Sequence, residues 1–143
     1  MMIKEIHKAA EDARIYIRQN REILGKMRAD DFGYTLKQLM KWNGVSVQAL
    51  ADRSLVSTKT IQRMRNREDY QASIETIIAL CIGMQLPPPV SHRFLELAGY
   101  QIRYSSDLLA TYDLILDEYY KSGIQTCNEL LLAMEFKELT SSD

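Results

Sequence analysis

The stretch "VQALADRSLVSTKTIQRMRN", residues 47–66, decides the fold. Ser46 stands just before its first half, and Ser57 opens its second half. Serine often precedes a helix because its side-chain oxygen accepts a hydrogen bond from a backbone N–H in the first turn. We therefore predict two short helices, separated by a tight turn at Leu55 and Val56.

The second of these helices has one apolar side and one polar side. Ile61 and Met64 lie three residues apart, so they share one face, which we expect to be buried. In the first helix, Ala51 is small enough for the two helices to cross closely. The outward face of the second helix then consists of Thr58, Lys59, Gln62, Arg63 and Asn66.

The remaining sequence also favours helices. Six glycines and three prolines are few for 143 residues, and no segment alternates apolar and polar residues as a half-buried strand does. We predict an all-α chain, with its other helices over residues 2–28, 35–43 (capped by Thr35, stopped at Gly44), 74–86 (capped by Ser73, stopped by Pro87), 91–100, 105–120 and 124–136 (after Gly123).

Positive charge is concentrated in the middle of an almost neutral chain. Residues 34–67 carry 7 basic groups and 1 acidic group, whereas residues 104–143 carry 2 and 8. Residues 1–33 carry 7 and 6, and residues 68–103 carry 2 and 4. This distribution indicates an anionic partner for the central part alone.

Two short helices joined by a tight turn, the second basic on its exposed side, are the outline of a DNA-binding helix-turn-helix. The residues themselves resemble the helix-turn-helix of the lambda-repressor/Cro type, often called the Xre family. The resemblance includes Leu50 with Ala51, Val56 with Ser57, and Ile61 with Met64.

The resemblance extends to the flanking segments, over about residues 34 to 100. "TLKQLMKWNGVS" (35–46) is similar to the family's preceding helix, and "SIETIIALCIGMQLPPPVSHRFLELAGY" (73–100) to its two following helices. It implies a five-helix lambda-repressor-like DNA-binding domain over 34–103. An N-terminal amphipathic helix (1–33) and an acidic C-terminal helical hairpin (104–143) complete the expected architecture.

In the resembled family, side chains near the start of the second helix and one turn later read bases. Here these positions are Thr58, Lys59 and Arg63. Lys and Arg donate to guanine O6 and N7, and a Thr methyl touches a thymine methyl. Residues expected to hold phosphates or border the read bases are Ser46, Gln48, Ser57, Gln62, Arg65, Asn66 and Lys41.

Two positions depart from the family pattern. Leu55 stands at the turn where the family usually has glycine, and a leucine there adopts a positive φ at a cost of about 1 kcal/mol. Val47 stands where many relatives carry a polar DNA-contacting residue, which predicts fewer contacts from the first helix.

The sequence favours no other chemistry. His7 and His92 have no Cys or His at ligand spacing, so we expect no metal site, and no phosphate loop or nucleophile motif points to an enzyme or a cofactor. The longest apolar run, residues 77–84, is too short to cross a membrane, and residues 1–16 do not read as a signal peptide. Cys81 and Cys127 are expected to be buried thiols of a cytoplasmic protein.

We therefore expect sequence-specific binding of double-stranded DNA by a bacterial or phage-type transcriptional regulator, most simply a repressor. Such proteins usually bind as homodimers on half-sites about one helical turn apart. The apolar stripes of residues 1–28 and 107–138 either supply the dimer or pack on their own monomer. The alternative function is a protein-interaction module or antitoxin-like adaptor, which grips a protein partner through the stripe from Leu108 to Tyr119.

Overall fold

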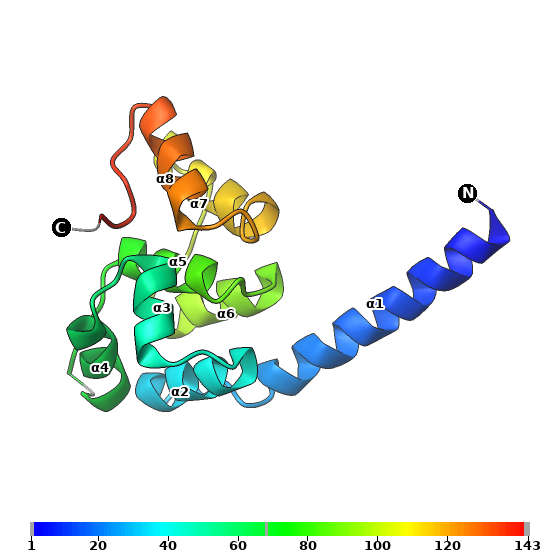
Figure 1. The fold of residues 1–143 in the computed structure, drawn as a ribbon, viewed down its shortest axis with the longest axis horizontal. Helices are drawn as coiled ribbons and strands as arrows, with labels where there is room; N and C mark the ends of the chain where they lie inside the picture. Colours follow the sequence, from blue (N-terminus) through cyan, green and yellow to red (C-terminus); the bar gives the residue numbers. More distant parts are fainter. Residues whose placement is uncertain (1, 68, 142–143) are drawn as a thin grey trace.

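The computed structural model describes residues 2–67 and 69–141. Within these residues the chain is all-helical, as predicted, with eight α-helices and no strand (Figure 1). The helices are α1 (Ile3–Leu24), α2 (Phe32–Asn43), α3 (Val47–Ser54), α4 (Thr58–Asn66), α5 (Ile74–Gly83), α6 (Pro88–Leu97), α7 (Asp107–Glu118) and α8 (Ile124–Ala133).

Helix α5 is the centre of the body. Every residue from Ile77 to Gly83 is buried, and α3, α6, α7 and α8 all pack against this helix. A helix that is apolar on all sides is stable in water only when other elements surround it. The apolar run 77–84 is therefore the core of the molecule, and α4 is held beside it through contacts with α2 and α3.

Three of the predicted helix starts are confirmed. Ser46, Ser57 and Ser73 each accept a hydrogen bond from the backbone N–H three residues later. The predicted stop at Gly44 is also confirmed, because this residue adopts the left-handed conformation, φ 73°, that glycine tolerates best.

The prediction that Thr35 caps α2 is wrong. The helix begins three residues earlier, where Asp31 Oδ1 accepts the N–H of Tyr34 at 2.9 Å. The buried Thr35 hydroxyl instead faces the chain entering α2: it accepts the N–H of Arg28 at 2.8 Å and donates to the carbonyl of Arg28 at 3.2 Å. Thr35 thus joins the end of the α1–α2 link to α2.

Two other helix bounds differ from the prediction. Helix α1 ends at Leu24, not near residue 28. Helix α6 begins at Pro88 rather than at Ser91, because a proline in the first turn of a helix has no N–H that needs a partner. The prolines therefore end one helix and begin the next.

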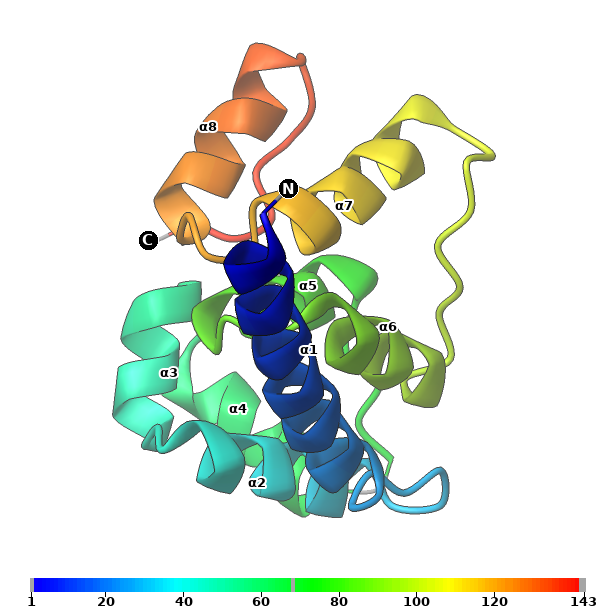
Figure 2. The same ribbon diagram turned by 90° about the vertical axis from the view of Figure 1, so that its right-hand side faces the viewer.

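Helices α7 and α8 lie on the side of the body away from α4 (Figures 1 and 2). The stripe from Leu108 to Tyr119 is largely used inside the molecule, because Tyr112, Ile115 and Leu116 are buried and α7 packs on α5 and α6. Burial raises the pKa of Tyr112 to about 12, and the nearby Glu75 carboxylate adds to the shift.

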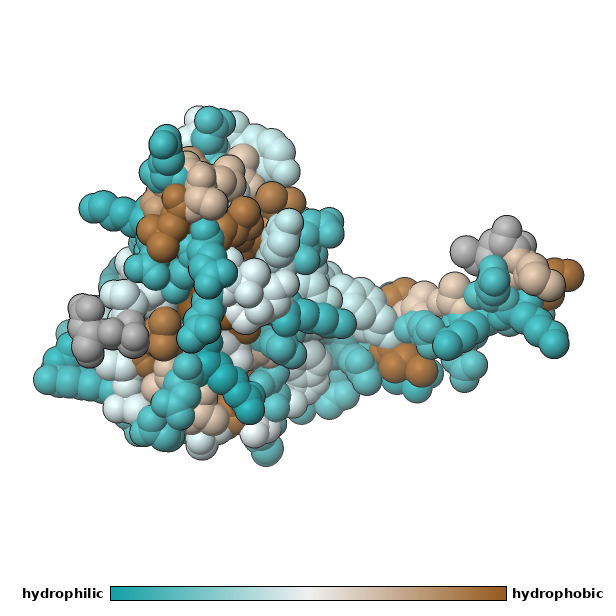
Figure 3. All heavy atoms as spheres, turned by 45° about the horizontal axis from the view of Figure 1, so that its top comes forward, coloured by the Kyte–Doolittle hydropathy of each residue, from teal (hydrophilic) through white to brown (hydrophobic). Residues whose placement is uncertain are grey.

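Helix α1 is attached to the body only by its last turns. Asn20 and Ile23 are buried, and the helix contacts α2 and α6. Towards its N-terminus it projects away from the rest of the molecule as an arm (Figure 1). Apolar and polar side chains are both exposed along this arm in the space-filling view (Figure 3).

Both cysteines are buried, as predicted. Loss of hydration raises the pKa of the Cys81 thiol to about 12 and that of Cys127 to about 11. In the part of the chain that the structure describes, no helix combines the length and the hydropathy that a bilayer crossing requires.

Candidate nucleic-acid interface

Helices α3 and α4 are two short helices joined by a three-residue turn. The Ser46 hydroxyl oxygen accepts the N–H of Ala49 at 3.0 Å, which fixes the start of α3. At the start of α4, the Ser57 hydroxyl oxygen accepts the N–H of Thr60 at 3.1 Å. The sequence thus defines the beginning of both helices through local hydrogen bonds.

The turn itself has the strained conformation that the sequence predicted. Leu55 has φ 60° and ψ 22°, in the left-handed region that costs a residue with a Cβ roughly 1–2 kcal/mol. The Leu55 N–H still donates to the carbonyl of Ala51 at 2.9 Å. Its side chain is half-buried and packs against the core, so apolar contact offsets part of the strain.

Ser54, which no local sequence pattern indicated, holds this turn from the inside. Its buried hydroxyl donates to the carbonyl of Leu50 at 2.6 Å and accepts the N–H of Val56 at 3.1 Å. Helix α5 approaches closely here, since a Cβ on Gly83 would lie 3.0 Å from the Ser54 Cβ. Two small residues therefore fix how α3 sits on the core.

A second contact reaches Ser54 from the far end of the chain. The Thr140 hydroxyl donates to the carbonyl of Ser54 at 2.6 Å. Asn128, on α8, accepts the N–H of Leu139 and donates to the carbonyl of Thr140, both at 2.8 Å. The segment after α8 is thereby attached to the end of α3.

The predicted inner and outer faces of α4 are confirmed. Ile61 and Met64 are buried, whereas Thr58 and Lys59 are exposed. Arg63 is half-buried. The helix therefore has a fixed apolar side in the body and a polar side in solvent.

The other side chains with a predicted role in DNA contact differ in their surroundings. Gln48 donates to Asp52 Oδ1 at 3.0 Å on α3, and Asn66 donates to Gln62 Oε1 at 3.4 Å on α4. Arg65 is half-buried, and its Nε is fully buried without a hydrogen-bond partner. Its backbone lies against the start of α2, where a Cβ on Gly33 would be only 2.5 Å from the Arg65 carbonyl oxygen.

These positions do not form one continuous row. Thr58, Lys59, Gln62, Arg63 and Asn66 share the outer side of α4, and Ser57 precedes it. Ser46 and Gln48 are exposed at the start of α3, and Lys41 is exposed on α2. Exposed polar groups are thus present on α2 and α3 as well as on the polar face of α4.

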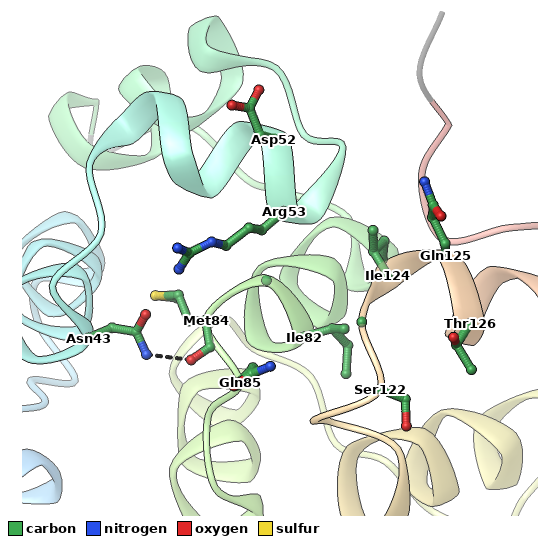
Figure 4. Close-up of a pocket in the computed structure, with 12 residues that line it drawn as sticks. Asn43, Asp52, Arg53, Ile82, Met84, Gln85, Ser122, Ile124, Gln125 and Thr126 are labelled. Carbon is green, nitrogen blue, oxygen red and sulfur yellow. Dashed lines mark hydrogen bonds between the residues drawn. The ribbon is translucent and has the colours of Figure 1, made fainter.

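A polar cleft of about 760 Å³ lies between α3, the end of α5 and the start of α8 (Figure 4). Arg53 extends along it towards Asn43 and Met84, while Asp52 points away (Figure 4). The Asn43 side-chain amide donates to the carbonyl of Met84. This bond ties the end of α2 to the end of α5.

His92 joins α6 to α7, a link that the sequence spacing did not indicate. Its Nε2 lies 2.9 Å from Asp117 Oδ1 and 3.5 Å from Asp113 Oδ1. The three residues offer ligand atoms within 4.8 Å of one another, close enough to share a cation. The short contact with Asp117 already satisfies the imidazole nitrogen, so the group serves as a polar link between the two helices.

Residues 35–86 match the family model of the Cro/C1-type HTH DNA-binding domain. This segment of the chain is similar to a Cro/C1-type helix-turn-helix domain. The resemblance inferred from α3 and α4 is thereby confirmed, and the matched segment runs from α2 to the end of α5. Neither the curated proteins nor the solved structures include a match to the chain.

The similarity to this domain type relates the geometry of α3 and α4 to DNA binding. A Cro/C1-type helix-turn-helix is a DNA-binding domain, and the basic residues 34–67 fall almost entirely inside the matched segment. Helices α1, α6, α7 and α8 lie outside it.

Proposed function

We propose that the protein is a sequence-specific double-stranded DNA-binding regulator of transcription, acting as a repressor. The observation that carries this proposal is the position of α4 within the Cro/C1-type domain: its apolar side is docked on the body, and its polar side is exposed. A major groove accepts one such helix, and the groove edges offer donors and acceptors to its side chains.

The roles of individual residues follow from their places on α4. Thr58 and Lys59, in the first turn, and Arg63, one turn later, are the proposed base-reading residues. The exposed amides at the start of α4, together with Ser57 and Asn66, suit phosphate oxygens. Lys41 and Ser46, on the neighbouring helices, extend the phosphate contacts on either side.

Arg65 has a different proposed role from the one its charge suggests. Its side chain leaves α4 on the side towards α2 and is half-buried. A half-buried guanidinium reaches fewer phosphates than an exposed one, so we assign Arg65 mainly to packing between α2 and α4.

Specificity requires more than one recognition helix, because a single helix reads too few base pairs to select a genomic site. We propose a homodimer with two-fold symmetry, in which residues 34–103 form the DNA-binding unit. Residues 104–143 enlarge the core of this unit, and their acidic surface faces away from DNA. No catalytic role is proposed for the chain, which we place in the cytoplasm.

Selection of bound sites from a random pool of duplex DNA tests the function directly. We expect an inverted repeat and a binding constant that falls steeply as salt rises, because Lys and Arg release counterions from the phosphates. Recovery of no shared sequence, with equal affinity for every duplex, contradicts the proposal.

The adaptor function receives less support. It depends on a free apolar stripe from Leu108 to Tyr119, but the middle of that stripe is buried against α5 and α6. A partner could grip it only after α7 had left the body, at the cost of exposing Tyr112, Ile115 and Leu116.

A further inference from the structure

The arm formed by the first four turns of α1 carries an apolar stripe that the body does not cover. Met2, Ile3, Ile6 and Ile17 are 71%, 72%, 49% and 48% exposed. Together with Ala10 and Ala13 these residues recur at spacings of three and four, as in a helix that packs on another helix. From Ile3 to Ile17 the stripe is about 21 Å long.

We propose that this stripe pairs with the same stripe of a second copy of the chain, with the two α1 helices antiparallel. The inference deepens the proposed function, since it rests on the dimer proposed there and names the surface that forms it.

The direction of the pairing follows from where the body lies. The stripe continues in sequence to Asn20 and Ile23, and both of these residues are buried by contacts with the chain's own body. A second helix running in the same direction would therefore meet α6 at this point. An α1 helix of the second copy that runs in the opposite direction covers the open length of the stripe. The rest of that copy then lies beyond the N-terminus of the first α1.

The side chains match in the antiparallel register. When Ile6 of one chain lies opposite Ile17 of the other, Ala10 lies opposite Ala13 on both sides of the two-fold axis. The alanines allow the helix axes to approach to about 8 Å, and the isoleucines close the two ends. Small side chains thus meet at the crossing, and large ones meet where the helices diverge.

Charges beside the stripe agree with this register. Glu11 of each copy comes within reach of Arg14 of the other, which gives two equivalent ion pairs on one side of the crossing. The interface is therefore held by apolar contact and, at its edge, by these two ion pairs.

The size of the surface sets the strength of the pairing. The open stripe is only about 21 Å long, so the paired area lies at or below about 1,200 Å², the lower end of the range for specific interfaces. We expect a dimer that dissociates in the micromolar range and that becomes complete on DNA, where two linked half-sites raise the effective concentration.

The test measures assembly of the full chain without DNA by sedimentation velocity. Ile17→Asp should give a monomer at concentrations where the natural chain is a dimer. Ile15→Asp is the matched control, because Ile15 is also an isoleucine, 44% exposed, but lies off the stripe on the outer side of the helix.

Disulfide cross-linking tests whether the two α1 helices pair in the antiparallel direction. Ile6→Cys mixed with Ile17→Cys should form a mixed disulfide, and neither variant should cross-link efficiently to itself; Cys81 and Cys127 are buried and do not compete. A monomeric natural chain, or equal effects of Ile15→Asp and Ile17→Asp, overturns the proposed surface. Efficient self-cross-linking of both single variants overturns the antiparallel direction.

These measurements separate the two proposals, because none of them involves DNA. A chain that stays monomeric and still selects a specific sequence removes the arm interface and leaves the regulator intact. If the interface is correct, α4 of each copy lies at the end of the dimer far from the arm crossing (Figure 1). Selected half-sites should then be separated by more than one helical turn.

Discussion

Arg63 and Lys41 separate two kinds of contact with DNA. Arg63→Ala is expected to cost about 1–3 kcal/mol of binding free energy and to relax the preference at one base pair, because the guanidinium is assigned to a base edge. Lys41→Ala should weaken binding to all DNA sequences alike. It should also reduce the slope of the logarithm of the binding constant against the logarithm of the salt concentration by about 1. Fluorescence anisotropy on selected and scrambled duplexes measures both effects; unchanged preference in Arg63→Ala contradicts the assignment.

Ser54 makes a residue-scale prediction about stability. Ser54→Ala removes a buried hydroxyl that donates to the carbonyl of Leu50 and accepts the N–H of Val56, and it leaves the Val56 N–H without a partner. We expect a loss of about 1–3 kcal/mol in the free energy of unfolding. Ser57→Ala, which removes an exposed cap, should cost about 1 kcal/mol. Urea unfolding compares the two, and a smaller loss for Ser54→Ala contradicts its role.

At this scale the sequence predicts what is local. Ser46, Ser57 and Ser73 were recognisable as caps because the bond closes within three residues. Thr35 was misassigned because the same residue type also bonds a distant backbone group, and here Asp31 was the better cap. The contact between Ser54 and Thr140 joins residues 86 apart, and no local pattern indicates such a pair.

At the scale of elements, Gly83 controls how closely α3 can pack on α5. Gly83→Ala would place a Cβ 3.0 Å from the Ser54 Cβ and 3.1 Å from Leu50 Cδ1, so α3 must shift outward. We expect a destabilisation of about 1–3 kcal/mol, typical of overpacked cores. Thermal unfolding of the variant and the natural chain measures this loss of stability.

Gly25→Ala provides the control for this substitution. Gly25 has φ −67°, and the nearest atom to an added Cβ is the Arg21 carbonyl oxygen at 3.3 Å. The substitution reduces the freedom of the unfolded chain, and we expect stability within about 0.5 kcal/mol of the natural chain or slightly above it. An equal loss in both variants means that the α3–α5 approach is not the cause.

The order of the elements was predictable, and their partners were not. The period of apolar residues located all eight helices, and the run 77–84 marked the buried one. The stripes of α1 and α7 look alike in sequence, yet Tyr112, Ile115 and Leu116 are buried, while Ile6 and Ile17 are exposed. Periodicity shows that a face is apolar, but only tertiary packing decides what covers it.

At the scale of the whole molecule, the two thiols make stability depend on pH in alkaline solution. The pKa of Cys81 rises from 9.0 to about 12, and that of Cys127 from 9.0 to about 11. Above pH 9.0 the unfolded chain loses these protons and the folded chain keeps them, so the free energy of unfolding falls as pH rises towards about 12. A Cys81→Ala, Cys127→Ala variant should lose less stability over this range; identical pH curves contradict the cause.

The hydrogen bond from Thr140 to Ser54 couples the opening of the segment after α8 to the opening of the turn between α3 and α4. The amide proton of Val56 is held by Ser54, and that of Leu139 by Asn128. If the segment after α8 and the turn between α3 and α4 open together, the amide protons of Val56 and Leu139 exchange with solvent deuterium at the same opening free energy. This free energy should be lower than that of the α5 amides. Thr140→Val should then accelerate exchange at both positions, 83 residues apart in sequence by their numbering.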